Sequence, residues 1–463
     1  MSTARLAPLR NAIGIIALLC AAPSTAQSLT SQQIAAIDAA ASKTLAETGV
    51  PAASIAITRD GQIVYAKAYG LQRAGQPASE DAKYPIGSVS KQFTAAAILI
   101  LADEGKLNLD DPVGKYLPAL TRGNDVTIRQ LLAHTAGYRD YWPQEYGFSD
   151  TLSPIEPNAI LQRWATKPLD FEPGTRRQYS NTGYVAAGLI VEKVSGQSLN
   201  AFLRDRIFSR LGMNPIDIGT DLTAKDPVGY ERNVLGPVRV ARPSARGWYF
   251  GAGQLGMTAM DLSRWDGSVI ARSVMSPAAY EAQQRTTVLK NGVATGYGLG
   301  MYVKDDNGHR LLEHQGGVTG FRSENRIFPD DRAAIVVLVN ADFNNAQVAI
   351  ADAIEQQLFS DDSGVDRLRT VFGMLRAGRI DRAQFTSNGN EHYTAQVLAD
   401  WQASLTQLGE PKGVEQTRSF LRGGLVNRHF TIAFANRSVE ATLLTEPGSR
   451  ARVEELVLVV PGN

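Results

Sequence analysis

One short stretch of the sequence, Gly87 to Lys91 (GSVSK), has residue types and a spacing that suit nucleophilic catalysis. On a helix, the Ser88 hydroxyl and the Lys91 amine lie one turn apart on the same face. A serine hydroxyl attacks well only when a neighbouring base removes its proton, and a partly buried lysine with a lowered pKa is such a base. The helix N-terminus would add free N–H groups and a positive field. The S-x-x-K spacing also arises by chance, with a surface serine beside a solvated lysine.

A second unit, Tyr179-Ser180-Asn181, is the only Y-x-N in the sequence. In a loop or short turn, residues two apart can point a phenol and an amide into one cavity. A nearby Lys91 ammonium would stabilise a phenolate, so we expect Tyr179 to lose its proton near neutral pH if the two meet. A turn with a packed tyrosine is the alternative for the triplet alone.

A third unit runs from Glu313 to Phe321 (EHQGGVTGF). A strand that ends in His-x-Gly-Gly lets its backbone approach a ligand closely, because glycine has no side chain in the way. One exposed N–H there, together with the N–H of Ser88, would form an oxyanion hole. A glycine-rich hairpin with a surface histidine is the alternative.

The elements that must position these units are predicted at both ends of the first 360 residues. Periodicity and turn residues predict a helix ended by Gly49 and a hairpin around Asp60-Gly61, then a second helix that carries Ser88. The expected helices are 30–48, 88–104 and 343–358, and the expected strands are 53–58, 62–68, 299–303, 311–314 and 333–339. We expect one sheet built from both ends, with a helical middle, 110–286, inserted beside it.

The chain is predicted to continue into a second, smaller domain. The polar stretch 360–364 is typical of a linker. A helical segment, 391–408, and strand candidates 417–421, 429–435, 439–444 and 453–460 follow it. The predicted fold class is therefore α+β, with domains at 27–360 and 365–463, the second of unknown role.

The first 26 residues predict an export signal. Arg5 and Arg10 precede a short apolar run, 12–22, and small residues end at Ala26, where we expect cleavage. An uncleaved helix is the alternative. The protein is therefore expected in the bacterial periplasm or outside the cell, with no integral membrane segment after cleavage. Cys20, the only cysteine, lies in this segment, so its lipidation stays open and the mature chain has no thiol.

Composition and histidine spacing exclude several classes of function. The 47 basic and 46 acidic residues give a formal net charge of +1, so no overall field would attract nucleic acid. The five histidines form no metal-binding pair, and no glycine-rich phosphate loop is present. We therefore expect no metal and no cofactor.

Together and in this order, the three units resemble the serine β-lactamase and penicillin-binding-protein superfamily. The Y-x-N unit is similar to the branch that holds class C β-lactamases, D-aminopeptidases, DD-peptidases and related esterases. The resemblance covers about Ser31 to Phe359 and implies an antiparallel sheet flanked by helices, with a helical insertion. Further stretches similar to this branch are 111–118, 131–138, 171–174, 181–184 and 251–262.

The resemblance implies a role for each catalytic residue. Ser88 would be the nucleophile, and Lys91 and Tyr179 would share the transfer of its proton. Attack on a carbonyl would form an acyl-enzyme, which water then hydrolyses.

The resemblance also assigns the substrate-binding residues. Asn181 would bind the acyl-side amide, and the N–H groups of Ser88 and Gly317 would form the oxyanion hole, with Gly316 giving the backbone room. His314 stands where class C β-lactamases have a lysine, and would steady the Lys91–Tyr179 pair or a substrate carboxylate. A mostly neutral histidine attracts a carboxylate less than an ammonium does, which disfavours penicillins as substrates.

The expected function is thus hydrolysis of esters, amides or peptides, as by an esterase, a D-aminopeptidase or a DD-peptidase. A β-lactamase and a non-catalytic penicillin-binding sensor are the alternatives, and the substrate is a small molecule or a peptide. The aromatic stretch 138–142, with Tyr146 and Phe148, is either a wall of the site or a packed surface loop. Arg322 either meets a substrate carboxylate or is an ordinary surface arginine. The oligomeric state stays open.

Overall fold

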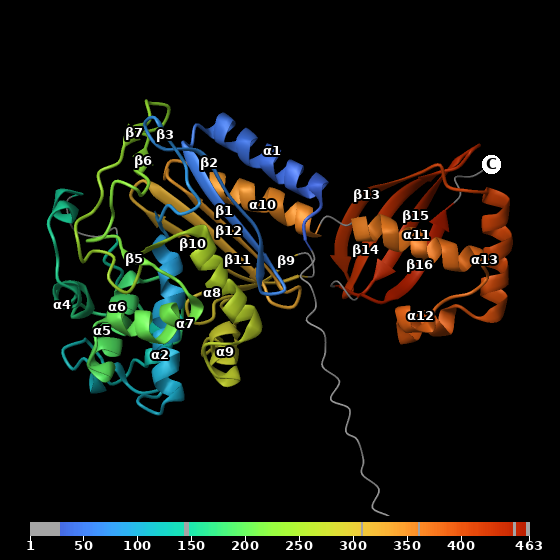
Figure 1. Cartoon of the computed structure of the whole chain (residues 1–463). Coiled ribbons are helices and arrows are strands. Elements are labelled where there is room, and N and C mark those ends of the chain that lie inside the picture. Colours follow the sequence, from blue (N-terminus) through green and yellow to red (C-terminus); the bar gives the residue numbers. More distant parts are fainter. Residues whose placement is uncertain (1–27, 143–147, 307–308, 360–361, 448–450, 460–463) are drawn as a thin grey trace, which may run out of the picture.

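The core of the protein is a seven-stranded antiparallel sheet, seen edge-on in Figure 1. The computed structural model describes residues 28–142, 148–306, 309–359, 362–447 and 451–459. The strands lie in the order β3 (Gln76–Pro77), β2 (Gln62–Arg73), β1 (Ala52–Arg59), β12 (Ala333–Val339), β11 (Phe321–Phe328), β10 (His309–Val318) and β9 (Tyr302–Asp306). The sheet does join the two ends of the first 360 residues, and the predicted α+β class is confirmed.

The centre of the sheet is the pair β1 and β12, in which Ile55 faces Val337. Every residue of β12 and all but the last of β1 are buried, because helices cover both faces. One face packs against α1 (Ser31–Thr48) and α10 (Ala346–Phe359), and the other packs against α8 (Ala259–Ala271) (Figure 1).

Local signals in the sequence account for the first elements. Thr30 and Gln33 form a capping box at the start of α1, and Gly49 ends the helix with a φ of 74°. Asp60 and Gly61 both have positive φ, 50° and 77°, which is the turn that a two-residue hairpin between twisted strands requires.

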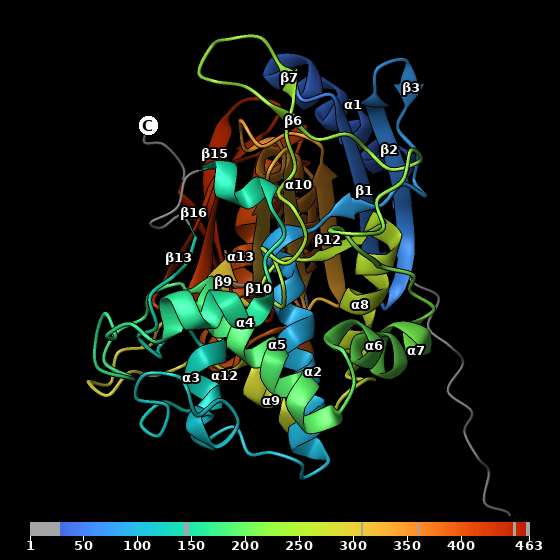
Figure 2. The same cartoon turned by 90° about the vertical axis from the view of Figure 1, so that its left-hand side faces the viewer.

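A helical lobe lies beside the sheet, with α2 (Ser90–Asp103) and α5 (Asn181–Ser195) packed together at its centre (Figure 2). Both helices are apolar over most of their length and contribute to one large hydrophobic cluster. The smaller helical elements are η2 (Val113–Lys115), α3 (Ile128–Leu132), η3 (Phe148–Leu152), α4 (Pro157–Ile160), η4 (Leu161–Ala165), α6 (Leu199–Leu203), η5 (Arg204–Phe208), α7 (Ser209–Leu211) and α9 (Pro277–Gln284). The short strands are β4 (Tyr84–Pro85), β5 (Ile216–Asp217), β6 (Tyr230–Glu231), β7 (Arg239–Val240) and β8 (Leu255–Met257).

The C-terminal part has its own four-stranded antiparallel sheet and its own hydrophobic cluster (Figure 1). The strands are β13 (Gly413–Arg422), β14 (Leu425–Ala433), β15 (Ser438–Thr445) and β16 (Val453–Val459), and the helical elements are α11 (Asp362–Arg376), η6 (Arg382–Gln384), α12 (Ser387–His392) and α13 (Ala395–Leu408). The linker predicted at 360–364 is wrong in its second half, because α11 already begins at Asp362.

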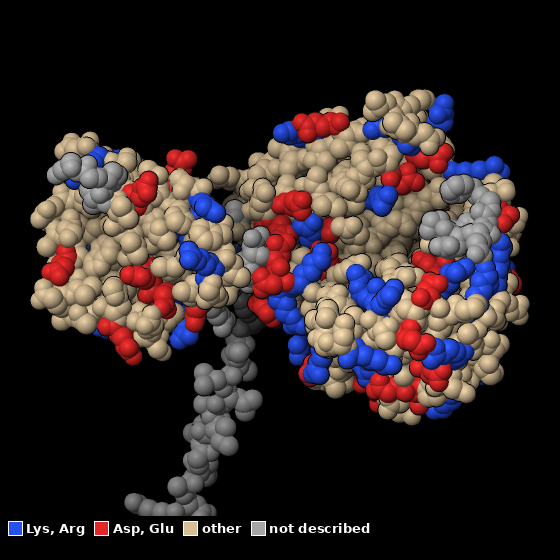
Figure 3. Space-filling model, turned by 180° about the vertical axis from the view of Figure 1, so that it is seen from behind, with Lys and Arg blue, Asp and Glu red and all other residues tan. Residues whose placement is uncertain are grey.

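On the face drawn in Figure 3, Lys and Arg side chains lie among Asp and Glu side chains. In the described part of the chain, no helix combines the length and the apolar composition needed to cross a lipid bilayer. The predicted signal segment, 1–26, lies outside the described residues.

Candidate active site

Ser88 and Lys91 meet at the start of α2, where a short 3-10 turn, η1 (Gly87–Val89), leads into the helix. The Lys91 Nζ lies 3.0 Å from the Ser88 Oγ. Lys91 is fully buried, whereas Ser88 is partly exposed to a cleft. The nucleophile is thus open to a substrate while the amine behind it is shielded from water.

The oxygen atoms around Lys91 fix the direction of its amine. Its Nζ lies 2.8 Å from the Asn181 Oδ1 and 2.7 Å from the backbone oxygen of Ala252. These two oxygens can only accept hydrogen bonds, so they take two N–H groups of a neutral amine and leave its lone pair for the Ser88 hydroxyl. Burial lowers the pKa of Lys91 to about 7, and the charge of Asp140 opposes that shift.

Asp140 determines which end of the Asn181 amide faces Lys91. Its carboxylate accepts from the Asn181 Nδ2, at 3.1 and 3.3 Å, and from the Asn181 backbone N–H, at 2.9 Å. A carboxylate cannot donate, so the Asn181 Oδ1 must point the other way, to Lys91. Sequence analysis did not give Asp140 a role in catalysis. The only indication in the sequence was an aspartate among aromatic residues directly after the 131–138 stretch.

Tyr179 lies between Lys91 and a group of aromatic rings. The Lys91 Nζ is 4.9 Å from the centre of the Tyr179 ring. The centres of the His134 and Tyr179 rings are 4.2 Å apart, with their planes tilted by 32°. Burial raises the pKa of Tyr179 well above its ordinary value, although a hydrogen bond with Ser88 lowers it in part. The expected phenolate is therefore wrong for the resting site. Lys91, with its lowered pKa, is the group that can be deprotonated near neutral pH.

His134 fixes the loop that carries Tyr179. Its Nδ1 accepts from the Ser180 N–H at 3.1 Å, and burial holds its pKa well below the ordinary value. A neutral ring that accepts at Nδ1 carries its proton at Nε2. Sequence analysis noted His134 only within the 131–138 stretch, since its contact with Ser180 is made across the fold.

His314, on β10, is buried and neutral. Its Nδ1 donates to the Gln315 backbone oxygen at 2.6 Å, so its Nε2 accepts from the Tyr297 hydroxyl at 3.1 Å. Burial and the nearby Lys91 lower its pKa to about 3. Its ring lies 6.2 Å from that of Tyr179. The geometry thus supports a role of His314 in holding the aromatic surroundings of Tyr179 and gives it no charge for a carboxylate.

The two glycines of β10 let this strand run against the turn that carries Ser88. A Cβ atom on Gly316 would lie 1.9 Å from the Ile86 backbone oxygen. A Cβ atom on Gly87 would lie 2.6 Å from the Gly317 nitrogen, and Gly87 has a φ of 52°, which favours glycine. The backbone of Gly317 is therefore beside Ser88, as an oxyanion hole made of their two N–H groups requires.

A cleft of about 660 Å³ is lined by Ser88, Asp140, Tyr179, Asn181, His314 and Gly317, with Lys91 buried behind it. Trp142 and Tyr249 form one wall, with ring centres 5.6 Å apart, so the aromatic stretch does contribute to the site. Tyr146 lies outside the described residues, and the side chain of Phe148 is likewise outside them. Arg322 also lines the cleft, and its Nε and Nη2 donate to the Asp342 backbone oxygen at 3.3 and 3.2 Å. Its Nη1 lies 3.4 Å from where a Cβ on Gly317 would be, beside the oxyanion strand.

A family model described as Beta-lactamase matches residues 37–358. The D-aminopeptidase of Brucella anthropi is 28% identical over 307 residues, which are 65% of this chain and 58% of that protein. Penicillin-binding protein 4* of Bacillus subtilis strain 168 is 26% identical over 418 residues, covering 84% of this chain and 91% of the relative. This chain thus spans less than two thirds of the first relative and most of the second.

Among solved structures, a D-stereospecific amidohydrolase from Streptomyces sp. superposes with a TM-score of 0.61 at 26% identity. The match covers 70% of this chain and 98% of that one.

Proposed function

This chain belongs to the Beta-lactamase family, and from that premise we propose that it is a serine hydrolase that works without a cofactor. Its substrates would be esters, amides or peptides, cleaved through an acyl-enzyme on Ser88. The observation that carries this proposal is the buried Lys91 amine, 3.0 Å from the Ser88 hydroxyl and with a pKa of about 7. A protein that only bound its ligand would have no need of a serine activated in this way.

In the first half of the proposed reaction, the Ser88 Oγ attacks the substrate carbonyl carbon while its proton passes to Lys91. The carbonyl oxygen becomes negative and is held by the N–H groups of Ser88 and Gly317. The bond to the leaving amine or alcohol then breaks. The leaving atom takes a proton from Tyr179, and Lys91 returns one to Tyr179.

In the second half, water attacks the ester that Ser88 has formed with the acyl group. The Tyr179–Lys91 pair accepts the proton of the water and later gives one back to Ser88. The acid is released and the site returns to its starting state, so no group is consumed.

The substrate class follows from the charges at the cleft. His314 is neutral, Lys304 pairs with Glu313, and Arg322 is the cation that lies beside Gly317. We therefore expect amides or peptides with a carboxylate that reaches Arg322, and the names of the D-aminopeptidase and D-stereospecific amidohydrolase favour D-configured residues. Arg322→Ala should raise KM about fivefold for a carboxylate-bearing substrate and leave that of its amide unchanged. An equal loss for both would remove Arg322 from substrate binding.

Turnover of p-nitrophenyl acetate and butyrate tests the proposal as a whole. Many equivalents of p-nitrophenol per enzyme are expected, and none with Ser88→Ala. A single burst that stops at one equivalent would instead support a penicillin-binding sensor. Nitrocefin hydrolysis well above the rate for simple esters would favour a β-lactamase.

We also propose that the protein is exported and cleaved after Ala26. Arg5 and Arg10, the apolar run 12–22 and the small residues before Gln27 support this. N-terminal sequencing of the mature protein should begin at Gln27, and a mature protein that begins at Met1 would contradict cleavage.

We further propose that residues 27–360 and 365–463 act as two domains. Their separate sheets and hydrophobic clusters support this division. Limited proteolysis should cut first near residue 360 and leave two stable fragments. Cleavage that begins inside either sheet would argue against it.

A further inference from the structure

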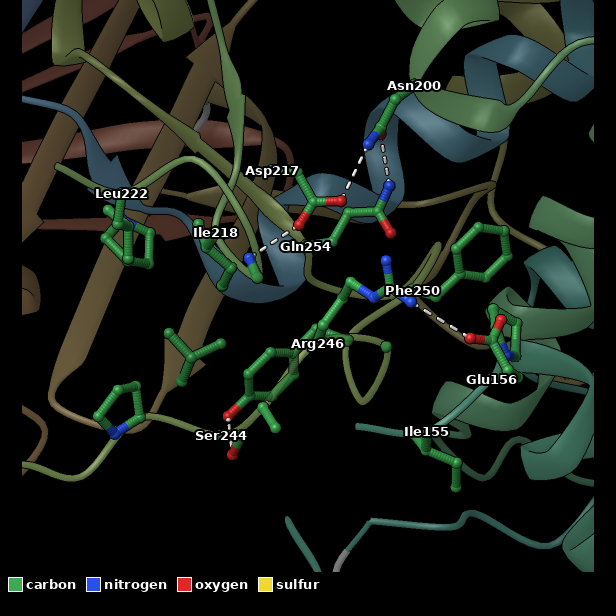
Figure 4. A pocket seen from close by; sticks show the side chains of 18 of the residues that line it. Ile155, Glu156, Asn200, Asp217, Ile218, Leu222, Ser244, Arg246, Phe250 and Gln254 are labelled. Carbon is green, nitrogen blue, oxygen red and sulfur yellow. Dashed lines mark hydrogen bonds and ion pairs between the residues drawn. The ribbon is translucent and has the colours of Figure 1, made fainter. Parts of the chain in front are cut away.

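A second cavity, of about 320 Å³ (Figure 4), shares two of its lining residues with the active-site cleft. Tyr249 and Val318 line both hollows. Val318 follows Gly317 on β10, so the partition between the two hollows begins one residue beyond Gly317. A substrate held at Ser88 would need only to pass these two side chains to enter the second cavity.

Tyr249 is placed as a movable partition. Its hydroxyl lies 3.0 Å from the Ser244 Oγ and 3.4 Å from the Thr319 Oγ1, which joins the 244–250 segment to the end of β10. Its ring is only half-buried and packs against Trp142. Two hydroxyl contacts at the protein surface are weak enough for a ligand to displace.

The partition lies on the acyl side of the cleft. The proton donor for the leaving group, Tyr179, packs against His134 and lies near His314. Trp142 and Tyr249 form a different wall of the cleft. This wall lies next to Asp140, which accepts from the Trp142 and Asn181 backbone N–H groups, and not next to His314. Because the leaving group departs toward Tyr179, the retained acyl group points toward Tyr249.

The second cavity has apolar walls and three carboxylates, of which Glu156 pairs with Arg246, Glu192 accepts from the Leu199 N–H, and Asp217 has no cation paired with it among the described residues. Ile218, Leu222 and Phe250 supply apolar surface (Figure 4). The Asp217 carboxylate accepts from the Asn200 Nδ2 at 3.0 Å and from the Gly219 N–H at 2.8 Å. These are the hydrogen bonds that the described residues give it, and both donors are neutral.

One further contact orients the amide that donates to Asp217, and the nearby cation pairs with another carboxylate. The Asn200 Oδ1 accepts from the Gln254 Nε2 at 2.5 Å, which turns the Asn200 amide so that its N–H₂ faces Asp217. The nearby Arg246 extends toward Glu156, 3.3 Å away, as Figure 4 shows.

We propose that this cavity is an extended acyl subsite, which takes the far end of a long acyl group with an apolar stem and a positively charged terminus. The stem would pass Val318 and Tyr249, and the cation would lie at Asp217. This inference rests on the proposed function, since it assumes that an acyl group is bound to Ser88.

The charge preference can be measured with p-nitrophenyl esters of matched length. Butanoate, hexanoate and octanoate esters would each be compared with the same ester carrying a terminal trimethylammonium group. At the length that reaches Asp217, the cationic ester should have the higher kcat/KM, by about fivefold. Asp217→Asn should remove that ratio, whereas Asp205→Asn, an exposed carboxylate outside both cavities, should keep it.

The partition is tested with Tyr249→Ala and Tyr249→Phe. Removal of the ring should raise the octanoate-to-acetate ratio of kcat/KM, and Tyr249→Phe, which loses only the two hydroxyl contacts, should raise it less. Ratios that do not respond to charge, length or these variants would overturn the subsite while ester turnover continues. Absence of turnover on every ester and amide would instead overturn the proposed function.

Discussion

Replacing Asp140 with asparagine tests whether this residue sets both the orientation of Asn181 and the basicity of Lys91. The substitution keeps the size of the side chain and an oxygen that can accept from the Trp142 N–H, now accepted at 3.2 Å. It removes the negative charge and adds an N–H₂ that can face the Asn181 amide either way. The fold should tolerate the change, because burial already raises the pKa of the Asp140 carboxyl and so disfavours its charge.

The size of the effect on Lys91 can be estimated from two hydrogen bonds in series. The contacts from Lys91 to Asn181, 2.8 Å, and from Asn181 to Asp140, 3.1 Å, bracket one amide group. The two charges are then at most about 8 Å apart, which at an effective dielectric constant of about 20 is worth about 2 kcal/mol. Loss of this attraction disfavours the ammonium and lowers the pKa of Lys91 below its present value of about 7.

The assay is the pH dependence of kcat/KM on p-nitrophenyl acetate. Neutral Lys91 is the base, so the wild-type rate should rise with pH through about 7. In Asp140→Asn this limb should move to lower pH by about one pH unit or more, which is the change that about 2 kcal/mol produces. The plateau should fall about tenfold, because neutral hydrogen bonds replace charged ones at Asn181.

A matched control is Asp170→Asn, which removes an exposed carboxylate that accepts from the Gln178 side chain. Its pH profile should coincide with that of the wild type. If the limb of Asp140→Asn stays in place or moves to higher pH while the variant remains folded, the account of Lys91 as a base tuned by Asp140 is refuted.

Three other outcomes follow from the site. Lys91→Ala and Tyr179→Phe should each lower kcat about a thousandfold, and the double variant should lose little more, because the pair acts as one unit; independent losses that multiply would contradict this. His314 has a folded pKa of about 3, below its unfolded value, so its contribution to stability is present above about pH 6.5 and is lost as the pH falls toward 3. At pH 5 that loss is about 2 kcal/mol, and thermal melts at pH 7.5 and 5 should show a smaller difference for His314→Gln than for the wild type. Gly316→Ala places a methyl 1.9 Å from the Ile86 oxygen, so it should abolish turnover by displacing β10, visible as a lower melting temperature; a stable and active variant would show that the strand can yield there.

The catalytic residues could be predicted from the sequence because each lies in a short unit with its own local geometry. Ser88 and Lys91 share one helical turn, Tyr179 and Asn181 lie at the start of α5, and Gly317 lies one residue before the end of β10. The order of the three units along the chain then gave the family resemblance that assigned their roles. The protonation of Tyr179 could not be predicted, because it depends on which rings surround it after folding.

Strand β11 was not predicted from hydrophobic periodicity, because several of its buried residues are polar. β11 contains Ser323, Glu324, Asn325 and Arg326, all buried, so it lacks the alternation of a half-exposed strand. Its polar groups are satisfied by distant partners, for example Asp266, which accepts from the Asn325 Nδ2 at 2.8 and 2.9 Å. The role of Asp140 could not be predicted for a similar reason, because its contacts with Asn181 form only when distant parts of the chain meet.

The pairing of β1 with β12 has a consequence for how the protein is made. Ala53 pairs with Val339, so the chain must be synthesised as far as residue 339 of 463 before both edges of its central strand β1 are covered. Such distant pairings are slow to form, so one edge of β1 stays open until β12 arrives, although β2 can pair with its other edge early. Ser88 is synthesised early and Gly317 late, and the turn that carries Ser88 packs against the strand that carries Gly317. We therefore expect the oxyanion hole to be completed only after β10 has joined the sheet, so that Ser88 gains its full reactivity late in folding.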